Sequence, residues 1–299
     1  TRVRSSRVFS MKNELLLDKR SMRQAFERAA ATYDAAAVLQ NEVCRRMLAR
    51  LEYIKHRPDA ILDAGSGTGN ALHGLSRRYP DASVVAFDIA LSMLLRARHR
   101  LPRWRSFFRR GLPQVCGDIE DLPFGEGVFA MVWSNLALQW VNDLPRAVAE
   151  MRRVLAPGGL LMFSTFGPDT LRELRAAYRD TDRHTHVNRF VDMHDIGDLL
   201  VHGGFSDPVM DMEQFTLTYD DVRQLMRELK AIGAHNVTLG RPGGLSGKAL
   251  LSAVTRNYEA LRRDGKLPAT FEVVYGHAWK ALPRTGPGGR PVIDIKPAR

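Results

Sequence analysis

The sequence predicts an α/β fold, in which a mostly parallel β-sheet is covered by helices on both faces. Apolar runs of strand length alternate with segments of helical periodicity between residues 60 and 166. A glycine-rich turn, DAGSGTG at 63–69, directly follows the first of these runs. Polar residues stand where later runs end, and the carboxyl ends of parallel strands meet at one edge of a sheet. We therefore expect a ligand site at this edge.

The elements before residue 166 follow from periodicity and from their boundaries. Residues 21–56 contain neither Pro nor Gly and place apolar residues at helical spacing, so we expect this segment to be helical. The Pro-Gly-Gly run at 157–159 is expected to end another helix. The predicted strands are 60–63, 81–88, 113–118, 127–135 and 159–166. The first predicted helix between them ends at about residue 78, and the other two are 92–101 and 144–155.

After residue 166 the pattern changes, and helical segments outnumber strands. Pro168 suits the first turn of a helix. The Gly-Gly pair at 203–204 suits the end of the next one. The predicted helices are 168–180, 194–205, 221–236 and 249–265, and the predicted strands are 208–219 and 269–280.

Positive charge is concentrated outside the expected core domain. Of the net charge of +11, residues 1–20 carry +4 (six Lys/Arg against two acids) and residues 283–299 carry +3 (four against one). We expect the first segment to be a flexible basic tail and the second a disordered tail rich in Pro and Gly. The core domain, 21–282, is expected to carry helical lid insertions at about 167–200 and 219–265.

Composition excludes several classes of protein. Apolar residues make up 44% and charged residues 26%, as in a soluble globular chain, and no apolar run approaches the length of a membrane span. Cys44 and Cys116 form no CxxC pair and have no neighbouring His cluster, so we expect neither a metal site nor a disulfide. Seven Arg without an acid at 89–117 form only a local basic patch, too narrow for a nucleic-acid interface. We expect a cytoplasmic monomer that binds neither nucleic acid nor membrane.

The glycine turn narrows the choice of ligand. A P-loop needs a Lys and a hydroxyl after its last glycine, and a dinucleotide motif needs glycine at position 70, which is Asn. The observed order is D-x-G-x-G-x-G, formed by Asp63, Gly65, Gly67 and Gly69. An acid at this place would repel a pyrophosphate, but it suits the α-ammonium group of S-adenosylmethionine, which has no phosphate. The glycines let the backbone pass close to the methionyl chain.

Further residues at strand ends fit the same ligand. Asp88 ends the second strand, where a carboxylate can accept both ribose hydroxyls, and Ile89 can pack against adenine. Asp118 can accept from the adenine amino group, and the Ile119 backbone N–H can donate to the ring. Asn135 ends the fourth strand and is expected to lie over the reaction centre. The alternative is a set of ordinary βα turns with capping acids.

Six segments of the sequence can be compared with known families: AFERAAATYDAAAVLQ, SNLALQWVNDLPRA, FSTFGPDTLRELRAA, HVNRFVDMHDIGDLL, LMRELKAIGAHN and LPATFEVVYGHAWK. Residues 60–166 resemble the class I S-adenosylmethionine-dependent methyltransferases. Over 21–282 the chain is similar to the malonyl-acyl-carrier-protein O-methyltransferase family of biotin synthesis, which methylates the free carboxyl of a malonyl thioester before elongation toward a pimeloyl ester. The resemblance implies a Rossmann-like sheet of seven strands with the last antiparallel, and an N-terminal helix that closes over the cofactor.

Three other functions stay open at this point. A sister group shares the WVNDLPRA, FGPDTL-like and PAT-type segments: a methyltransferase-like factor of mitochondrial complex I assembly that hydroxylates an arginine. The HVNRF and KAIGAHN segments favour the biotin family. A small-molecule methyltransferase, for instance of a quinone, would usually need an acid–base pair or a carbanion-stabilising site. A scaffold that binds the cofactor without turnover is the non-enzyme alternative.

The implied reaction needs no general base, because a carboxylate with a pKa of about 4 is already ionised at pH 7. Positioning and exclusion of water then supply the catalysis. Arg189 is our first candidate to orient the substrate and His186 the second, although Arg189 could instead tie the lid to the core. Tyr33 could cover the methyl donor and hydrogen-bond the substrate, or it could only pack. Gln139 and Trp140 are expected to line the same wall.

The implied substrate is carried by an acidic acyl carrier protein or by coenzyme A. A carrier protein delivers its acyl group on a long phosphopantetheine arm, so we expect a basic docking surface whose attraction weakens with salt. Two candidates are the Arg-rich stretch 96–110 and a set of Arg172, Arg175 and Arg179 on one predicted helix. The sequence does not distinguish between them.

Overall fold

The structure of the protein is a computed structural model, and the residues described are 16–100, 112–179, 181, 186–234 and 248–282. Its strands are β1 (Ala60–Ala64), β2 (Ser83–Asp88), β3 (Gln114–Cys116), β4 (Phe129–Asn135), β5 (Leu155–Phe166), β6 (Phe205–Tyr219) and β7 (Leu267–Lys280). Its helices are α1 (Lys19–Ala29), α2 (Tyr33–Ala36), α3 (Val38–Arg50), α4 (Leu72–Arg78), α5 (Leu91–Ala97), α7 (Leu144–Val154), α8 (Arg172–Tyr178), α9 (Met193–His202), α10 (Val222–Ala231) and α11 (Lys248–Glu259), with 3-10 turns at Leu51–Tyr53 and Leu138–Trp140.

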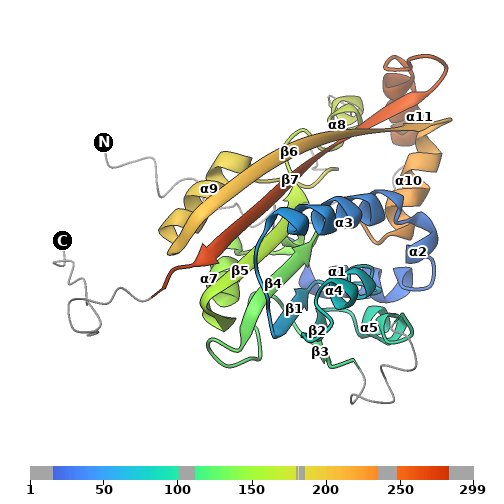
Figure 1. Ribbon diagram of the computed structural model, residues 1–299. Helices are drawn as coiled ribbons and strands as arrows, with labels where there is room; N and C mark the ends of the chain where they lie inside the picture. The colour runs from blue at the N-terminus through green and yellow to red at the C-terminus, as the bar shows by residue number, and fades with distance from the viewer. Residues whose placement is uncertain (1–15, 101–111, 180, 182–185, 235–247, 283–299) are drawn as a thin grey trace, which may run out of the picture.

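Within these residues the strands form one seven-stranded sheet in the order β3-β2-β1-β4-β5-β7-β6 (Figure 1). Every pairing is parallel except the two made by β7, which runs antiparallel to β5 and to β6. The register places Ala64 of β1 beside Phe87 of β2, and Asp88 beside Cys116 of β3, so the strand ends that carry polar residues are neighbours. The predicted α/β fold with its last strand antiparallel is confirmed.

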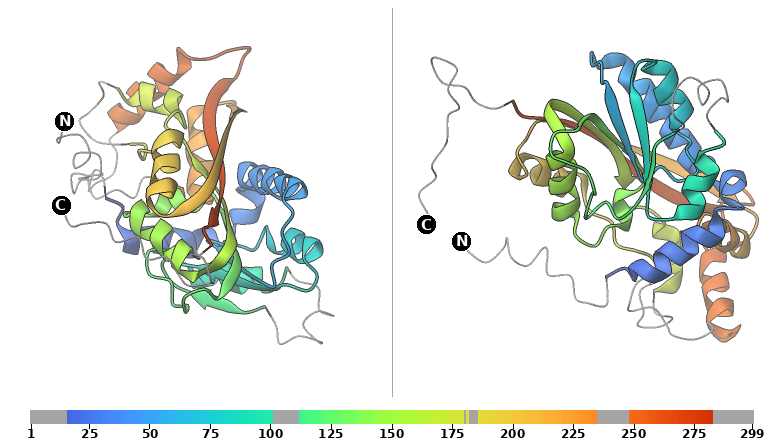
Figure 2. Two further views of the ribbon diagram at one scale, coloured as in Figure 1. Left: turned by 60° about the vertical axis from the view of Figure 1, so that its left-hand side comes forward. Right: turned by 90° about the horizontal axis from the view of Figure 1, so that it is seen from below.

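Helices cover both faces of the sheet, as expected (Figure 2). Successive strand residues point to opposite sides. Ile61 and Trp133 pack in one core with α3, α4 and α5, whereas Leu62 and Val132 pack in a second core with α7 and α9. Trp133 is completely buried, so the centre of the sheet is sealed on the α3 side. These two cores hold the strand ends in fixed relative positions.

Two pairs of helices interrupt the later strands. The helices α8 and α9 lie between β5 and β6, and α10 and α11 lie between β6 and β7, within the segments expected to form lid insertions. The helix α9 ends at His202 and is capped by Gly203, as the Gly-Gly pair predicts. The division of the chain into core, lid and tails stays a prediction. Residues 1–15 of the first expected tail and all of the second, 283–299, lie outside the described residues, whereas Lys19 and Arg20 of the first belong to α1.

The segment 21–56 is helical over most of its length, but it forms α1, α2 and α3 with short breaks between them. At the first break Thr32 donates its hydroxyl to the carbonyl of Ala231 at the end of α10, at 3.2 Å. Directly after it, Asp34 accepts a hydrogen bond from the Thr68 hydroxyl at 2.5 Å. These tertiary contacts outweigh the helix propensity of the alanine-rich run.

The strand β5 starts earlier than expected. The helix α7 ends at Val154 and β5 begins at Leu155, so the Pro-Gly-Gly run at 157–159 lies inside the strand. Leu155 already pairs with Phe129 of β4, and the register then shifts before regular pairing resumes. The run therefore forms an irregularity within a strand and does not separate the helix from the strand.

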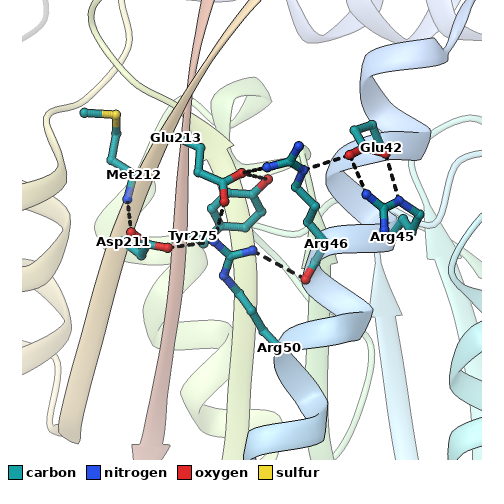
Figure 3. A network of polar contacts seen from close by, with 8 residues as sticks. All are labelled: Glu42, Arg45, Arg46, Arg50, Asp211, Met212, Glu213 and Tyr275. Carbon is teal, nitrogen blue, oxygen red and sulfur yellow. Dashed lines mark hydrogen bonds and ion pairs between the residues drawn. The ribbon is translucent and has the colours of Figure 1, made fainter.

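The helix α3 is fixed against β6 and β7 by a network of ion pairs (Figure 3). Arg46 pairs with Glu213 of β6 at 2.8 Å, and Arg50 reaches Asp211 at 2.6 Å and Glu213 at 3.1 Å. The Arg50 guanidinium also lies 3.8 Å from the centre of the Tyr275 ring on β7. These contacts hold the helix that forms one wall of the site described next.

Candidate active site

Three adjoining cavities open at the carboxyl ends of the strands in the described part of the chain. The first, called here the α1 cavity, lies between α1 and the ends of β2 and β4 and is bordered by Phe26 and Asp88. The second, the turn cavity, surrounds the glycine turn and is bordered by Asp63. The third, the α8 cavity, lies between α8 and α10 and is bordered by Leu174 and Met226. The α1 and α8 cavities measure about 640 and 970 Å³ when the solvent at their open mouths is included.

Six residues connect the three cavities. Tyr33, Gly65, Gly67 and Asn135 border both the α1 cavity and the turn cavity. Trp140 borders both the α1 cavity and the α8 cavity. Gln40, near the start of α3, borders both the turn cavity and the α8 cavity. The three cavities therefore form one branched site.

The glycine turn brings backbone close to the α1 and turn cavities. Gly65 has a φ of +80°, and a Cβ there would lie 2.3 Å from the Cβ of Ala137. Gly67 has a φ of +52° and open space where its Cβ would stand, because it borders both cavities. Gly69 has another role, since a Cβ there would lie 2.9 Å from Ala97 on α5. Gly69 thus allows helix packing and is not among the described residues that line these cavities.

Asp63 is buried at the end of β1 without a balancing cation among the described residues. Its side chain is 1% exposed, and its Oδ2 atom is sealed from solvent with no hydrogen-bond partner. Burial, and then the charge of Asp88, raise the pKa of Asp63 to about 8. A cationic ligand in the turn cavity would satisfy this carboxylate, so the residues present fit the ammonium group that the sequence predicts.

Asp88 is held by the backbone of two turns. Its Oδ2 accepts from the Gly67 N–H at 2.8 Å and its Oδ1 from the Ala90 N–H at 2.9 Å. Burial raises the pKa of Asp88 to about 6, although these hydrogen bonds act in the opposite direction. Each carboxylate oxygen still has a lone pair, so this side chain can accept two hydroxyl groups from the α1 cavity.

The far end of the α1 cavity contains the other predicted contacts. Ile89, Asp118 and Ile119 all border it. Asp118 already accepts from the Lys19 ammonium group at 3.0 Å, so α1 is tied to the end of β3. Ile119 is nearly buried and presents an apolar side. Together these residues can hold a flat heterocycle between apolar walls with polar atoms at one edge.

Asn135 is fixed at the end of β4 by hydrogen bonds on both sides of its amide. Its Oδ1 accepts from the Ser164 hydroxyl at 2.9 Å, and its Nδ2 donates to the Gln40 carbonyl at 3.3 Å. The next residue, Leu136, has a φ of +48°. Such left-handed backbone at a non-glycine residue is strained, and strain of this kind often occurs at functional sites.

The N-terminal helices form the outer wall of the α1 cavity. Met22 and Phe26 of α1 border it together with Tyr33 of α2. Glu27 anchors α1, because its carboxylate accepts from the backbone N–H groups of Leu91 and Ser92 at the start of α5, both at 2.8 Å. Burial is the largest cause that raises the pKa of Tyr33, so its phenol stays protonated and can donate a hydrogen bond.

The described residues that border the α8 cavity are mainly apolar. Apart from one histidine, their polar groups are uncharged. His186 borders it and stacks on Tyr178 of α8, with ring centres 3.8 Å apart. The Oδ1 atom of Asn188 is sealed there without a partner. Arg189, by contrast, is exposed and is not among the described residues that border this cavity. The structure thus brings His186 and Tyr33 to the site but does not bring Arg189 to it.

The described residues contain no group of three or more His, Cys, Asp or Glu side chains that could hold a metal ion. In the same residues no helix is long and apolar enough to cross a membrane. Among the site residues that the motifs did not indicate are Lys19, Phe26 and Gln40. They come from the N-terminal helices, where periodicity predicts a packed face but not what that face covers.

The sequence and the fold are similar to those of known methyltransferases. Residues 62–163 match the family described as "Methyltransferase domain". The malonyl-[acyl-carrier protein] O-methyltransferase of Nitrosospira multiformis is 61% identical over 90% of this chain and 91% of its own, and that of Gallionella capsiferriformans is 59% identical over 94% and 97%. A solved structure of the Haemonchus contortus phosphoethanolamine N-methyltransferase 2 in complex with S-adenosyl-L-methionine shares the fold, with a TM-score of 0.51, 17% identity and coverage of 85% of this chain and 57% of its own. The chain belongs to the malonyl-[acyl-carrier protein] O-methyltransferase family.

Proposed function

We propose that this protein transfers the methyl group of S-adenosylmethionine to the free carboxylate of a malonyl thioester on acyl carrier protein. The product, a malonyl methyl ester, can be elongated toward the pimeloyl ester used in biotin synthesis. Membership of the family supports this substrate. The observation that carries the cofactor assignment is the sealed, unpartnered carboxylate oxygen of Asp63 beside the glycine turn. The reaction would take place in the cytoplasm, which suits two free cysteines.

The residues of the α1 and turn cavities would hold the cofactor as follows. Asp63 accepts from its ammonium group, and Asp88 accepts from its ribose hydroxyls. Asp118 and the Ile119 backbone bind the edge of adenine, while Ile89 packs against the ring. When bound, the cofactor supplies a methyl group on a cationic sulfonium; transfer forms a C–O bond from a carboxylate lone pair and returns the C–S electrons to sulfur.

The α8 cavity would hold the malonyl group. Its apolar wall, which includes Phe166, Leu174 and Phe271, limits access of water. Charge is neutralised as the methyl group moves, so an apolar site favours the transition state over the separated, solvated ions. The substrate carboxylate is already ionised at pH 7, and no proton has to move in the step. The work of the protein is then to align the two reactants and to exclude water.

The α8 surface is our proposed dock for the carrier protein. One side of α8 borders the α8 cavity through Leu174 and Tyr178. Its other side exposes Arg172 and Arg175, and the exposed Arg179 follows directly after the helix. An acidic protein bound there would be close to the mouth through which its phosphopantetheine arm must enter. Most of the alternative stretch, 96–110, lies outside the described residues.

A transfer assay tests the proposal. The purified protein is mixed with radiolabelled S-adenosylmethionine and malonyl-acyl carrier protein, and the acyl group is examined for an alkali-labile methyl label. Malonyl-coenzyme A serves as a second acceptor, and acetyl-acyl carrier protein, which has no free carboxyl, serves as the negative control. Label on malonyl but not on acetyl groups is the expected result.

Other outcomes would favour the competing functions. Hydroxylation of an arginine in a partner protein, without methyl transfer, would support the sister group. Methylation of a quinone-type phenol but of no carboxyl substrate would support a small-molecule methyltransferase. Cofactor binding without turnover on any of these acceptors would support a scaffold.

A further inference from the structure

The methyl-donor end of the site and the proposed acyl cavity meet at one side chain. Gln40 is the residue that borders both the turn cavity and the α8 cavity among the described residues. It is 8% exposed and lies in the first turn of α3, just after the break that follows α2. In the proposed function, which this inference presupposes, the reacting carboxylate must lie at this junction.

The backbone of Gln40 is fixed in place. Its carbonyl accepts from the Asn135 Nδ2 at 3.3 Å, which ties α3 to the tip of β4. Further along the same helix, Arg46 and Arg50 fasten α3 to β6 and β7 (Figure 3). A side chain on this helix therefore has a well-defined origin with respect to the strand ends, as a group that orients a reactant requires.

The side-chain amide of Gln40 has no hydrogen-bond partner in the described structure, and its atoms are not among the sealed polar atoms. They therefore keep some accessible surface, and the residue borders two cavities. Gln139, the other glutamine of the α8 cavity, differs in this respect. Its Nε2 donates to the Leu136 carbonyl at 2.6 Å, and its Oε1 accepts from the Thr165 hydroxyl at 3.3 Å. Of these two glutamines, only Gln40 has an amide available to a ligand.

The chemistry of methyl transfer favours a neutral donor at this place. An Arg or Lys bound to the attacking oxygen would lower its nucleophilicity, and neither residue type borders the α8 cavity or the turn cavity among the described residues. An uncharged amide can bind one carboxylate oxygen while the other keeps a lone pair for attack. Its hydrogen bond is still strengthened by the negative charge of the acceptor.

We propose that the side-chain amide of Gln40 donates a hydrogen bond to the non-attacking oxygen of the substrate carboxylate and so aims the other oxygen at the methyl group. Transfer forms the O–CH₃ bond, breaks the S–CH₃ bond and moves no proton, so Gln40 acts only by orientation. The amide also favours the ionised substrate over the ester product, whose oxygen carries no net charge.

The test uses the full chain and four proteins: wild type, Gln40→Met, Gln40→Glu and the matched control Gln139→Met. Methionine has nearly the length of glutamine and no amide, so the helix should keep its packing. For each protein we measure kcat/KM with malonyl-acyl carrier protein, Kd for S-adenosylmethionine, and Tm. We also measure the affinity for malonyl and for malonyl methyl ester thioesters in the presence of S-adenosylhomocysteine.

Gln40→Met should lower kcat/KM by about tenfold to a hundredfold, the loss expected for a hydrogen bond to a charged group. Its Kd for S-adenosylmethionine should stay within about twofold of wild type, and its preference for the malonyl acid over the methyl ester should disappear. Gln40→Glu should lose more, because a second carboxylate repels the first. Gln139→Met should keep the preference for the acid, whatever its effect on Tm.

Three results would overturn the inference while the wild type is active: turnover by Gln40→Met within twofold of wild type, an equal loss of cofactor affinity and of turnover, or an unchanged preference for the acid over the ester. A wild-type protein that methylates no malonyl thioester but is active on another acceptor would overturn the proposed function and this inference with it. The wild-type measurement thus separates the two failures.

Discussion

The buried carboxylate of Asp63 should make cofactor binding depend strongly on pH. In the ligand-free protein its pKa is raised to about 8, mainly by burial, so most molecules carry a protonated Asp63 at neutral pH. A cationic ammonium group needs the ionised form. Binding therefore requires loss of this proton, and the affinity should rise by up to about tenfold for each pH unit below 8.

Isothermal titration calorimetry between pH 6.0 and 7.5 measures this effect. Over that range an α-amino group with a pKa of about 7.7–8.0 stays mainly protonated, so the ligand itself adds little to the slope. Binding at pH 7 should release about one proton, which is visible when the titration is repeated in buffers of different ionisation enthalpy. Asp88, with a pKa of about 6, adds to the slope mainly at the acidic end.

The stability of the free protein should fall as the pH rises, whereas its affinity for the cofactor should increase. The pKa of Asp63 is higher in the folded protein than its ordinary value of 3.8, so the folded state binds more protons than the unfolded state between these two values. The contribution of Asp63 to stability is therefore complete below pH 3.8 and is lost as the pH rises through 8. Stabilisation by the ligand, measured as a shift in Tm, should grow over the same range.

The variant Asp63→Asn separates this explanation from others. Its amide cannot titrate, so its weaker binding should be nearly independent of pH from 6.5 to 7.5 and should release no proton. A wild-type affinity that stays flat over this range, or an equal slope in wild type and Asp63→Asn, would refute the reasoning.

Three further predictions concern the frame of the site. Glu27→Gln should lower the free energy of unfolding by about 1 kcal/mol, because it weakens the cap of α5, and should reduce cofactor affinity about fivefold. Arg23→Gln removes only an exposed ion pair and should change both quantities little. Calorimetry on the two variants measures both effects. Gly276→Ala should destabilise the protein by about 1–3 kcal/mol in urea unfolding, because its Cβ would lie 2.3 Å from the Phe163 ring, whereas Gly197→Ala in α9 should be neutral or stabilising. Added salt should raise KM for malonyl-acyl carrier protein more steeply than KM for malonyl-coenzyme A, if the basic α8 surface attracts the carrier, and parallel curves would contradict that dock.

The ligand-binding edge of the sheet could be predicted because its residues are set by local rules. Asp63 and Asp88 end apolar strands, and such ends meet at one edge in any parallel α/β sheet. The glycines need positive φ or close approach, which the turn pattern already indicates. For Gly69 the pattern does not say whether the close neighbour is a ligand or a helix, and here it is Ala97 of α5.

The outer walls of the site could not be predicted in the same way. The breaks around α2 depend on contacts with Ala231 and Thr68, which are distant in sequence, while the local propensity favours a continuous helix. Arg189 is a candidate anchor by residue type, but its side chain is exposed, and residue type alone does not predict burial. Gln40 stands seven residues after Tyr33, beyond the break between α2 and α3, and only the folded α3 shows which cavities it borders.

The attachment of α3 to β6 and β7 has a consequence for synthesis of the protein. Arg50 and Glu213 are 163 residues apart in the chain, and Tyr275 is farther still. A ribosome delivers α3 first, whereas the acids that fix it follow at least 161 residues later and the ring later still. We therefore expect the wall that contains Gln40 to become ordered only after β6 and β7 have been synthesised, so that a shorter nascent chain has no complete reaction chamber.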